Sequence, residues 1–160
     1  MSLLQRAALS AGALLMMTMS AGVAACELLL AEHRSGRPLA RLALDPQRPT
    51  ATVAFTHSVL GTPVSDRYEW RHEGPASRAH LVEERFEGDG YGLPNAAGPG
   101  QTLTRDGAGW RLQLDRVVDP LVLPPVQQMR VLIDGQQPLL LSSLTNKSVA
   151  LRAEGCPSAH

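Results

Sequence analysis

The chain of 160 residues carries no net charge, few aromatic residues and no long amphipathic helical pattern. Without an excess of basic side chains it lacks the face that neutralises phosphates, which argues against nucleic acid as a partner. The same balance argues against a basic patch on an anionic membrane. Aromatic residues make up 4% of the chain, so leucine and valine must fill most of any core.

The first 25 residues have the layout of a secretory signal helix that is cleaved from the mature protein. Arg6 precedes an apolar run from Ala7 to about Met19, and small residues follow up to Ala25. The run is shorter than the ~20 residues of a membrane span, although a permanent anchor is the alternative. We therefore predict an exported, periplasmic protein with a single domain over residues 26–160, which contain 14 basic and 15 acidic side chains.

Two fates compete for Cys26, the first residue of that domain. In an oxidising compartment, Cys26 and Cys156 can form a disulfide that joins the first and last strands. Alternatively, "VAAC" is a lipobox, and a lipid on Cys26 holds the protein at a membrane. The strand-like "ELLLAEH" follows where a lipoprotein usually has a polar tether, which favours the disulfide.

Short strand-like runs follow one another along the mature chain. Residues 50–57 place Ala51, Val53 and Phe55 on one face and threonines on the other, and residues 110–115 alternate in the same way. Other runs cover residues 26–33, 39–44, 66–72, 78–87, 128–133, 138–144 and 148–154. This spacing predicts an all-β fold, an antiparallel β-sandwich or flattened barrel of about 8–10 short strands. The larger core side chains are expected to be Phe55, Tyr68, Trp70, Phe86 and Trp110.

The segment Glu87–Gln101, "EGDGYGLPNAAGPGQ", is rich in glycine and proline and has no periodicity. At this length a loop in a small domain is either functional or a plain flexible connector. Gly90 and Gly92 permit positive φ angles, which would let backbone N–H groups approach a ligand or another chain closely.

Three motifs together resemble a bacterial family. They are "HSV" at 57–59, Asp66-x-Tyr68, and "GYGLP" at 90–94, with "DGAGW" following at the expected distance. The chain is similar, from about residue 26 to 152, to the family called domain of unknown function 1850. The resemblance implies a small exported β-rich protein associated with tripartite periplasmic, TRAP-type, transporters, and it implies no known reaction. Leu60 stands where the family tends to have an acid, which weakens a charge-based role for the first motif.

The chemistry of the hairpin favours binding over catalysis. His57 and Ser58 are neighbours in an extended chain and point to opposite faces, and no GxSxG elbow is present, so we predict no catalytic residues. Asp66 is expected to hydrogen-bond His57 across the hairpin and fix its tautomer. The spacing of the acids and histidines is not that of a metal site, and His72 and His80 are expected to be solvated; no metal and no cofactor are predicted.

Two interpretations stay open. In one, six residues form a recognition surface for a small molecule or a transporter component: His57, Ser58, Asp66, Tyr68, Gly90 and Gly92. In the other, they only shape a hairpin and a loop. We predict a non-enzymatic accessory or binding protein of a periplasmic solute transport system. A hydrolase that uses His57 and Asp66 as base and orienter, and a lipid-anchored structural envelope domain, are the alternatives.

Overall fold

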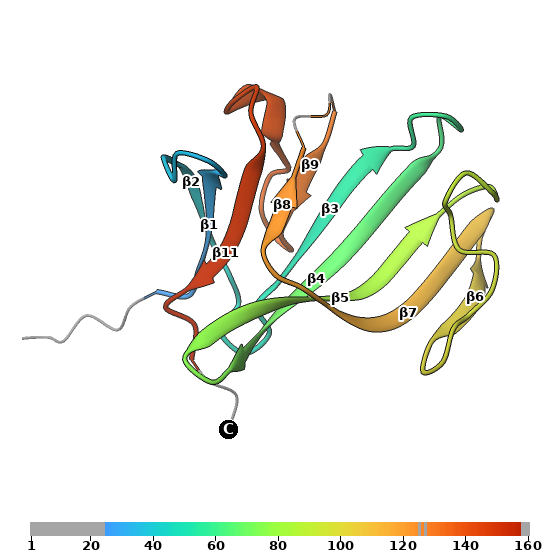
Figure 1. Cartoon of the computed structure of the whole chain (residues 1–160), viewed down its shortest axis with the longest axis horizontal. Helices are drawn as coiled ribbons and strands as arrows, with labels where there is room; N and C mark the ends of the chain where they lie inside the picture. The colour runs from blue at the N-terminus through green and yellow to red at the C-terminus, as the bar shows by residue number, and fades with distance from the viewer. Residues whose placement is uncertain (1–24, 125, 127, 158–160) are drawn as a thin grey trace, which may run out of the picture.

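The computed structural model describes residues 25–124, 126 and 128–157, and these residues form two antiparallel sheets (Figure 1). In order across the smaller sheet lie β2 (Pro38–Ala43), β1 (Glu27–Glu32), β11 (Val149–Glu154) and β8 (Leu121–Leu123). Across the larger sheet lie β10 (Leu139–Leu140), β9 (Arg130–Leu132), β3 (Thr50–Thr56), β4 (Pro63–Glu73), β5 (Ala76–Phe86), β7 (Gly109–Val118) and β6 (Thr102–Asp106). The predicted all-β sandwich is confirmed. The predicted signal helix lies outside the described residues.

The core forms between the inner faces of the two sheets, as the alternation of the sequence requires. Leu28 and Leu30 of β1 are fully buried and meet the buried Val53 of β3 and Val131 of β9 in one cluster. The aromatic side chains predicted for the core join this cluster. Tyr68, Trp70 and Phe86 are buried, and Phe55 and Trp110 are partly buried against it. Figure 1 shows that β7 and β6 lie on the side of the larger sheet away from β1 and β2.

A β-bulge in β5 changes which of its side chains face inward. Arg67 pairs with Glu83 but the next residue of β4, Tyr68, pairs with Leu81, so Val82 is an extra residue on β5. Leu81 faces the core on one side of the bulge and Phe86 does so on the other. As a result Glu84, which is two residues before Phe86, lies on the inner face directly opposite Asp66.

Two strands of the structure are absent from the sequence prediction. The three residues of β8 are too few to show a period. The five residues of β6 directly follow the Gly/Pro-rich segment and form a hairpin with β7, in which Asp106 pairs with Gly109. Gly109 is required there, because a Cβ atom at this position would lie 2.4 Å from the Phe86 carbonyl oxygen of β5.

Cys26 and Cys156 form a disulfide between the start of β1 and the chain just after β11. The predicted pairing is therefore present, and it leaves no free Cys26 sulfur for a lipid. His72 of β4 in the larger sheet also contacts this end of the chain, since its Nε2 lies 2.8 Å from the Cys156 carbonyl oxygen. Among the residues described, no helix has both the length and the apolar character needed to cross a bilayer.

Candidate functional site

The turn after β3 is closed by the imidazole of His57. The backbone amides of Val59 and Leu60 donate to His57 Nδ1 at 3.3 and 3.2 Å, and the amide of Gly61 donates to the His57 carbonyl oxygen at 2.9 Å. Because Nδ1 accepts, the ring carries its proton on Nε2. The backbone of its own turn thus fixes the tautomer of His57.

The expected hydrogen bond between His57 and Asp66 is absent from the described structure, since Asp66 pairs with Val53 and so lies well along the hairpin from the turn that holds His57. Ser58 is exposed, and no described residue hydrogen-bonds its hydroxyl. The two neighbours therefore do not make a nucleophile and base. His57 keeps a structural role in the turn and remains half-buried, with its Nε2–H available for a further contact.

The Gly/Pro-rich segment lies beside this turn. The Thr62 hydroxyl donates to the Glu87 carbonyl oxygen at 2.9 Å, and a Cβ atom on Gly88 would lie 3.1 Å from the side chain of Leu60. Further along, the amide of Leu93 donates to the Gly90 carbonyl oxygen at 3.0 Å. The segment therefore packs against the end of the β3–β4 hairpin.

Tyr91 sits in an unusual backbone conformation at the tip of that segment. The φ angles of Tyr91 and Gly92 are 50° and 92°, which makes residues 90–93 a type I′ turn. Glycine or asparagine is the usual residue at Tyr91's position, and a bulky side chain there carries strain. The Tyr91 side chain is nevertheless 71% exposed, so packing does not hold it in place.

The turn, the segment and the inner face of the larger sheet border a half-open cavity, hereafter the loop cavity, of about 250 Å³. Its polar lining comes from His57, Asp66 and Glu84. Its apolar lining comes from Phe55, Val64, Phe86, Tyr91, Gly92, Leu93 and Pro94. Of the six residues singled out from the sequence, the structure thus brings together His57, Asp66 and Gly92, and adds Glu84, which the sequence prediction missed.

Asp66 is the most perturbed acid in this cavity. Burial, and then repulsion from Glu84, raise the pKa of Asp66 to about 7, while Arg116 acts in the opposite direction. No hydrogen bond or ion pair from a described residue reaches the Asp66 carboxyl. Glu84 has one long ion pair, with 3.9 Å between its Oε1 and Nη2 of Arg116. The Arg116 side chain is 63% exposed, so it neutralises Glu84 only weakly.

Tyr68 and Gly90 do not line the loop cavity. Tyr68 packs in the core with 6% of its surface exposed, on the same face of β4 as Asp66. Burial, and then the nearby Asp66, raise the pKa of Tyr68, so its hydroxyl stays protonated. Gly90 is exposed, and a Cβ atom there would meet nothing within 4 Å. Both residues therefore lie outside the lining of the loop cavity.

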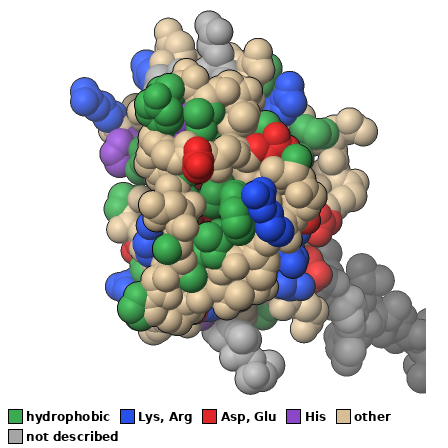
Figure 2. Space-filling view, turned by 90° about the vertical axis from the view of Figure 1, so that its right-hand side faces the viewer, with side chains coloured by type: hydrophobic (Ala, Val, Ile, Leu, Met, Phe, Trp, Pro, Cys, Tyr) green, Lys and Arg blue, Asp and Glu red, His purple; other side chains and the backbone are tan. Residues whose placement is uncertain are grey.

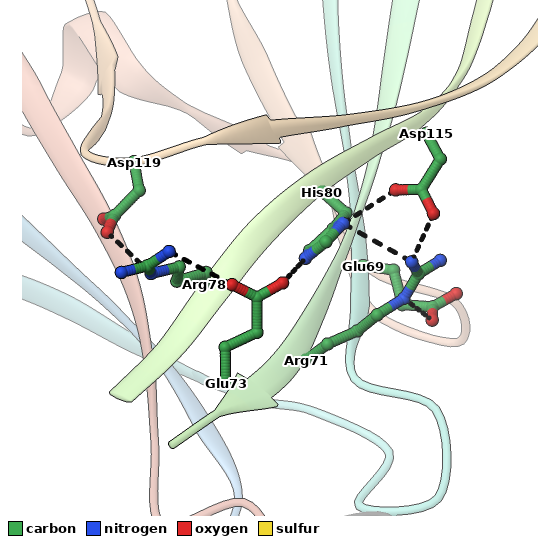
Figure 3. Close-up of polar contacts among 7 residues, drawn as sticks. All are labelled: Glu69, Arg71, Glu73, Arg78, His80, Asp115 and Asp119. Carbon is green, nitrogen blue, oxygen red and sulfur yellow. Dashed lines mark hydrogen bonds and ion pairs between the residues drawn. The ribbon is translucent and has the colours of Figure 1, made fainter. Parts of the chain in front are cut away.

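The opposite face of the larger sheet carries a charge cluster around His80, which is buried rather than solvated (Figure 3). His80 Nδ1 lies 2.7 Å from Asp115 Oδ1, and Nε2 lies 2.9 Å from Glu73 Oε1. Arg71 bonds the other Asp115 oxygen at 2.7 Å, and Arg78 bonds the other Glu73 oxygen at 3.1 Å. The hydrogen bond from His80, and then that from Arg71, lower the pKa of Asp115. These mutual bonds tie β4, β5 and β7 together and leave no group aimed at a ligand.

A larger hollow of about 460 Å³ also opens on the outer side of the sheet. It includes Thr56, Ser65, Arg85 and Arg130. Arg85 already pairs with Glu83 and Asp106, at 2.8 and 3.0 Å. In the described part of the chain, no three His, Cys, Asp or Glu side chains gather closely enough to hold a metal ion. The loop cavity is therefore the better candidate, because it contains a half-buried acid that lacks a partner among the described residues.

Fold and cavity together define a small disulfide-linked β-sandwich domain with a loop-covered cavity in its larger sheet. Figure 2 shows the β6–β7 side of this domain, where hydrophobic side chains gather in the middle of the face with charged side chains beside them. The chain belongs to the family described as a domain of unknown function (DUF1850), which matches residues 51–139. That range contains every residue of the loop cavity. Comparisons with curated proteins and with solved structures gave no match.

Proposed function

We propose that this protein is an exported, non-enzymatic binding protein whose loop cavity takes a small molecule, and that it works beside a periplasmic solute transport system. The observation that carries the binding role is the Asp66 carboxyl, which is half-buried in a cavity and has no partner among the described residues. A buried polar group without a partner is costly and marks a place where an outside group can supply the missing contact.

The setting of the cavity supports the same role. Ligand sites are concave and mostly apolar, with a few convergent polar groups. The loop cavity has this composition, with a strained, exposed Tyr91 at its rim. The Cys26–Cys156 disulfide suits an oxidising compartment, which supports export. The transport context rests on the resemblance of the "HSV" and "GYGLP" motifs to a transporter-associated family.

A thermal-shift screen with small solutes of mixed charge tests the binding role. A ligand of the loop cavity should raise the melting temperature of the wild type, and should raise that of Glu84→Gln much less. Glu83→Gln is the matched control, because Glu83 is the neighbouring residue on β5 and lies outside the cavity lining. Equal responses of the two variants would place binding elsewhere, and no response to any solute would remove the proposal.

Crosslinking in the native envelope tests the transport context. If the protein works beside a transporter, mild crosslinking followed by mass spectrometry should recover a transporter component with it. If no transporter component is recovered, the proposed association with a transport system is wrong, while the binding role of the loop cavity is unaffected.

A hydrolase is the second candidate, because a carboxyl with a pKa of about 7 beside a second carboxylate can act as a general acid. The hydrolase suggested by the sequence, with His57 as base and Asp66 as orienter, would need a hydrogen bond between these two side chains, and the described structure does not contain it. Hydrolysis by the Asp66–Glu84 pair would show a pH–rate profile with an inflection near pH 7. It would be lost in both Asp66→Asn and Glu84→Gln, and retained in Glu83→Gln.

A further inference from the structure

We propose that the ligand of the loop cavity is a small organic cation, with an ammonium group that contacts the carboxyls of Asp66 and Glu84 and an alkyl body against the aromatic rings. This inference rests on the proposed binding role and specifies the chemical class of the ligand.

The charge balance of the cavity favours a cation. Asp66 and Glu84 face each other on β4 and β5, and opposed side chains of an antiparallel pair have Cβ atoms about 5 Å apart. None of the described Lys and Arg residues lines the cavity. Arg116, at 3.9 Å from Glu84, is largely solvated. An incoming ammonium would therefore meet two carboxyls with little competition from the protein's own cations.

The remaining walls fit an organic ion better than a metal ion. Phe55, Phe86 and Tyr91 contribute aromatic rings, which attract cations through their faces and also pack against alkyl groups. A hard metal ion needs six or more oxygen ligands, whereas this lining offers two carboxyls, one imidazole and apolar side chains. A volume of about 250 Å³ accommodates a short alkylammonium.

The titration of Asp66 adds a recognisable signature to such binding. Since the pKa of Asp66 is about 7 in the empty cavity, its carboxyl is mostly protonated at pH 6 and mostly ionised at pH 8. The titratable groups around it are Tyr68 on the same strand, Glu84 on β5 and Arg116 on β7, and His57 and Tyr91 line the same cavity from the turn and the loop. A cation favours the ionised form, so binding below pH 7 must release a proton. Affinity should therefore rise with pH and level off above about pH 8.

Three probes with the same four-carbon body test the charge requirement: butylammonium, butanol and butanoate. We expect butylammonium to shift the backbone NMR signals of Tyr91, Gly92 and Leu93 saturably, with a dissociation constant on the order of millimolar. Binding should be about tenfold weaker at pH 6 than at pH 8, as a carboxyl with a pKa near 7 dictates. Butanol and butanoate should bind at least tenfold more weakly.

Variants locate the effect and separate it from folding. Asp66→Asn and Glu84→Gln should each lose butylammonium binding by tenfold or more, and Asp66→Asn should also lose the pH dependence. Glu83→Gln should bind as the wild type does. The NMR spectrum of each variant reports its folding directly, and Asn at position 66 removes a charge that burial disfavours.

Two outcomes would contradict the proposal that the ligand is a cation, and both differ from the outcome in which the cavity binds nothing. If butanol or butanoate shifts the same signals as strongly as butylammonium, the cavity binds small molecules but the charge assignment is wrong. If butylammonium shifts these signals equally in Glu83→Gln and Glu84→Gln, the carboxyls do not recognise it. If no probe and no solute of the thermal-shift screen affects the cavity, the binding role falls as well.

Discussion

Glu32 and Asp66 are two acids drawn away from solvent, and their surroundings are opposite. Glu32, at the end of β1, has 3% of its side chain exposed and is surrounded by partners: Arg37 at 2.5 Å, Ser35 at 2.7 Å, Thr145 at 3.1 Å and Lys147 at 3.2 Å. Hydrogen bonds from Arg37, and then from the other three, lower the pKa of Glu32 to about 2. Asp66 has no such partner among the described residues, and burial raises its pKa to about 7.

This contrast separates a structural acid from one that awaits a partner. At Glu32 the protein supplies both cations and hydroxyls, so the carboxylate ties the β1–β2 turn to the chain before β11. At Asp66 the protein supplies a second carboxylate, which disfavours ionisation. We therefore expect the hydrogen bonds of Glu32 to stabilise the folded state of the smaller sheet. Ionisation of Asp66 in the loop cavity is expected to destabilise the folded state.

The largest change in stability is expected when the disulfide that holds the smaller sheet is removed. Cys26 and Cys156 are 130 residues apart in sequence, so a double Ser variant should lose about 5 kcal/mol of unfolding free energy through added freedom of the unfolded chain. Urea denaturation measures the loss. A reducing agent should lower the stability of the wild type in the same way and leave the variant unchanged. A wild type indifferent to reduction would show that the smaller sheet does not depend on this link.

A smaller and opposite effect is expected for Asp66→Asn. In the wild type the folded pKa of about 7 exceeds the ordinary value of 3.8. The folded state therefore holds its proton while the unfolded state releases it, and stability falls as pH rises from about 4 to about 8. The variant lacks this loss, so at pH 8 it should be more stable than the wild type by at most about 4 kcal/mol.

Denaturation curves at pH 4 and pH 8 measure this gain, which should vanish at pH 4. Glu83→Gln removes the same charge outside the cavity and should show no comparable gain. If Asp66→Asn were destabilised at pH 8, Asp66 would belong with Glu32 among the structural acids.

Glu32→Gln should act in the opposite direction to Asp66→Asn. With a pKa of about 2, Glu32 stabilises the fold fully above about pH 4.5, and this contribution is lost as pH falls toward 2. The variant should melt at a lower temperature at pH 7 and show a flatter acid dependence. Because Arg37 and Lys147 are 60% and 65% exposed and can be hydrated, the change should be modest. Melting curves from pH 2 to 7 check this, with the more exposed Glu27→Gln as control.

The smallest effect is expected for Ser58→Ala. Ser58 is exposed and has no hydrogen bond to a described residue, so its loss should change stability by less than about 0.5 kcal/mol. Ligand responses of the loop cavity should also stay unchanged. A strong loss of binding would mean that the hydroxyl, and not the carboxyl pair, defines the site.

The fold was readable from the sequence wherever side chains alternate without interruption. Residues 50–57 and 110–115 show this, because each strand has one face in the core and one in water. The same rule carries a signal at Asp66, which stands in phase with the buried Val64, Tyr68 and Trp70 and so had to face inward. An acid in an apolar phase is an indication of a site that needs no structure to be seen.

The inward position of Glu84 and the burial of His80 could not be predicted from the alternation of side chains. The bulge at Val82 shifts the phase of β5, so that Glu84 faces inward although Leu81, three residues earlier, does so too. His80 has the phase of an outward residue, and it is buried only because Glu73, Arg71 and Asp115 from adjacent strands close around it. Both outcomes depend on the register between strands that are far apart in sequence.

The position of the disulfide has a consequence for how the domain can be displayed. Figure 1 shows the start of β1 and the end of β11, which the disulfide joins, at the lower left, whereas the ends of β3 and β5 that border the loop cavity lie toward the upper right. Anything fixed to the chain just before Cys26 would therefore lie at the other end of the domain from the strand ends that line the loop cavity. Immobilisation through this end should therefore leave the cavity accessible to solutes, whereas attachment near Tyr91 should obstruct it.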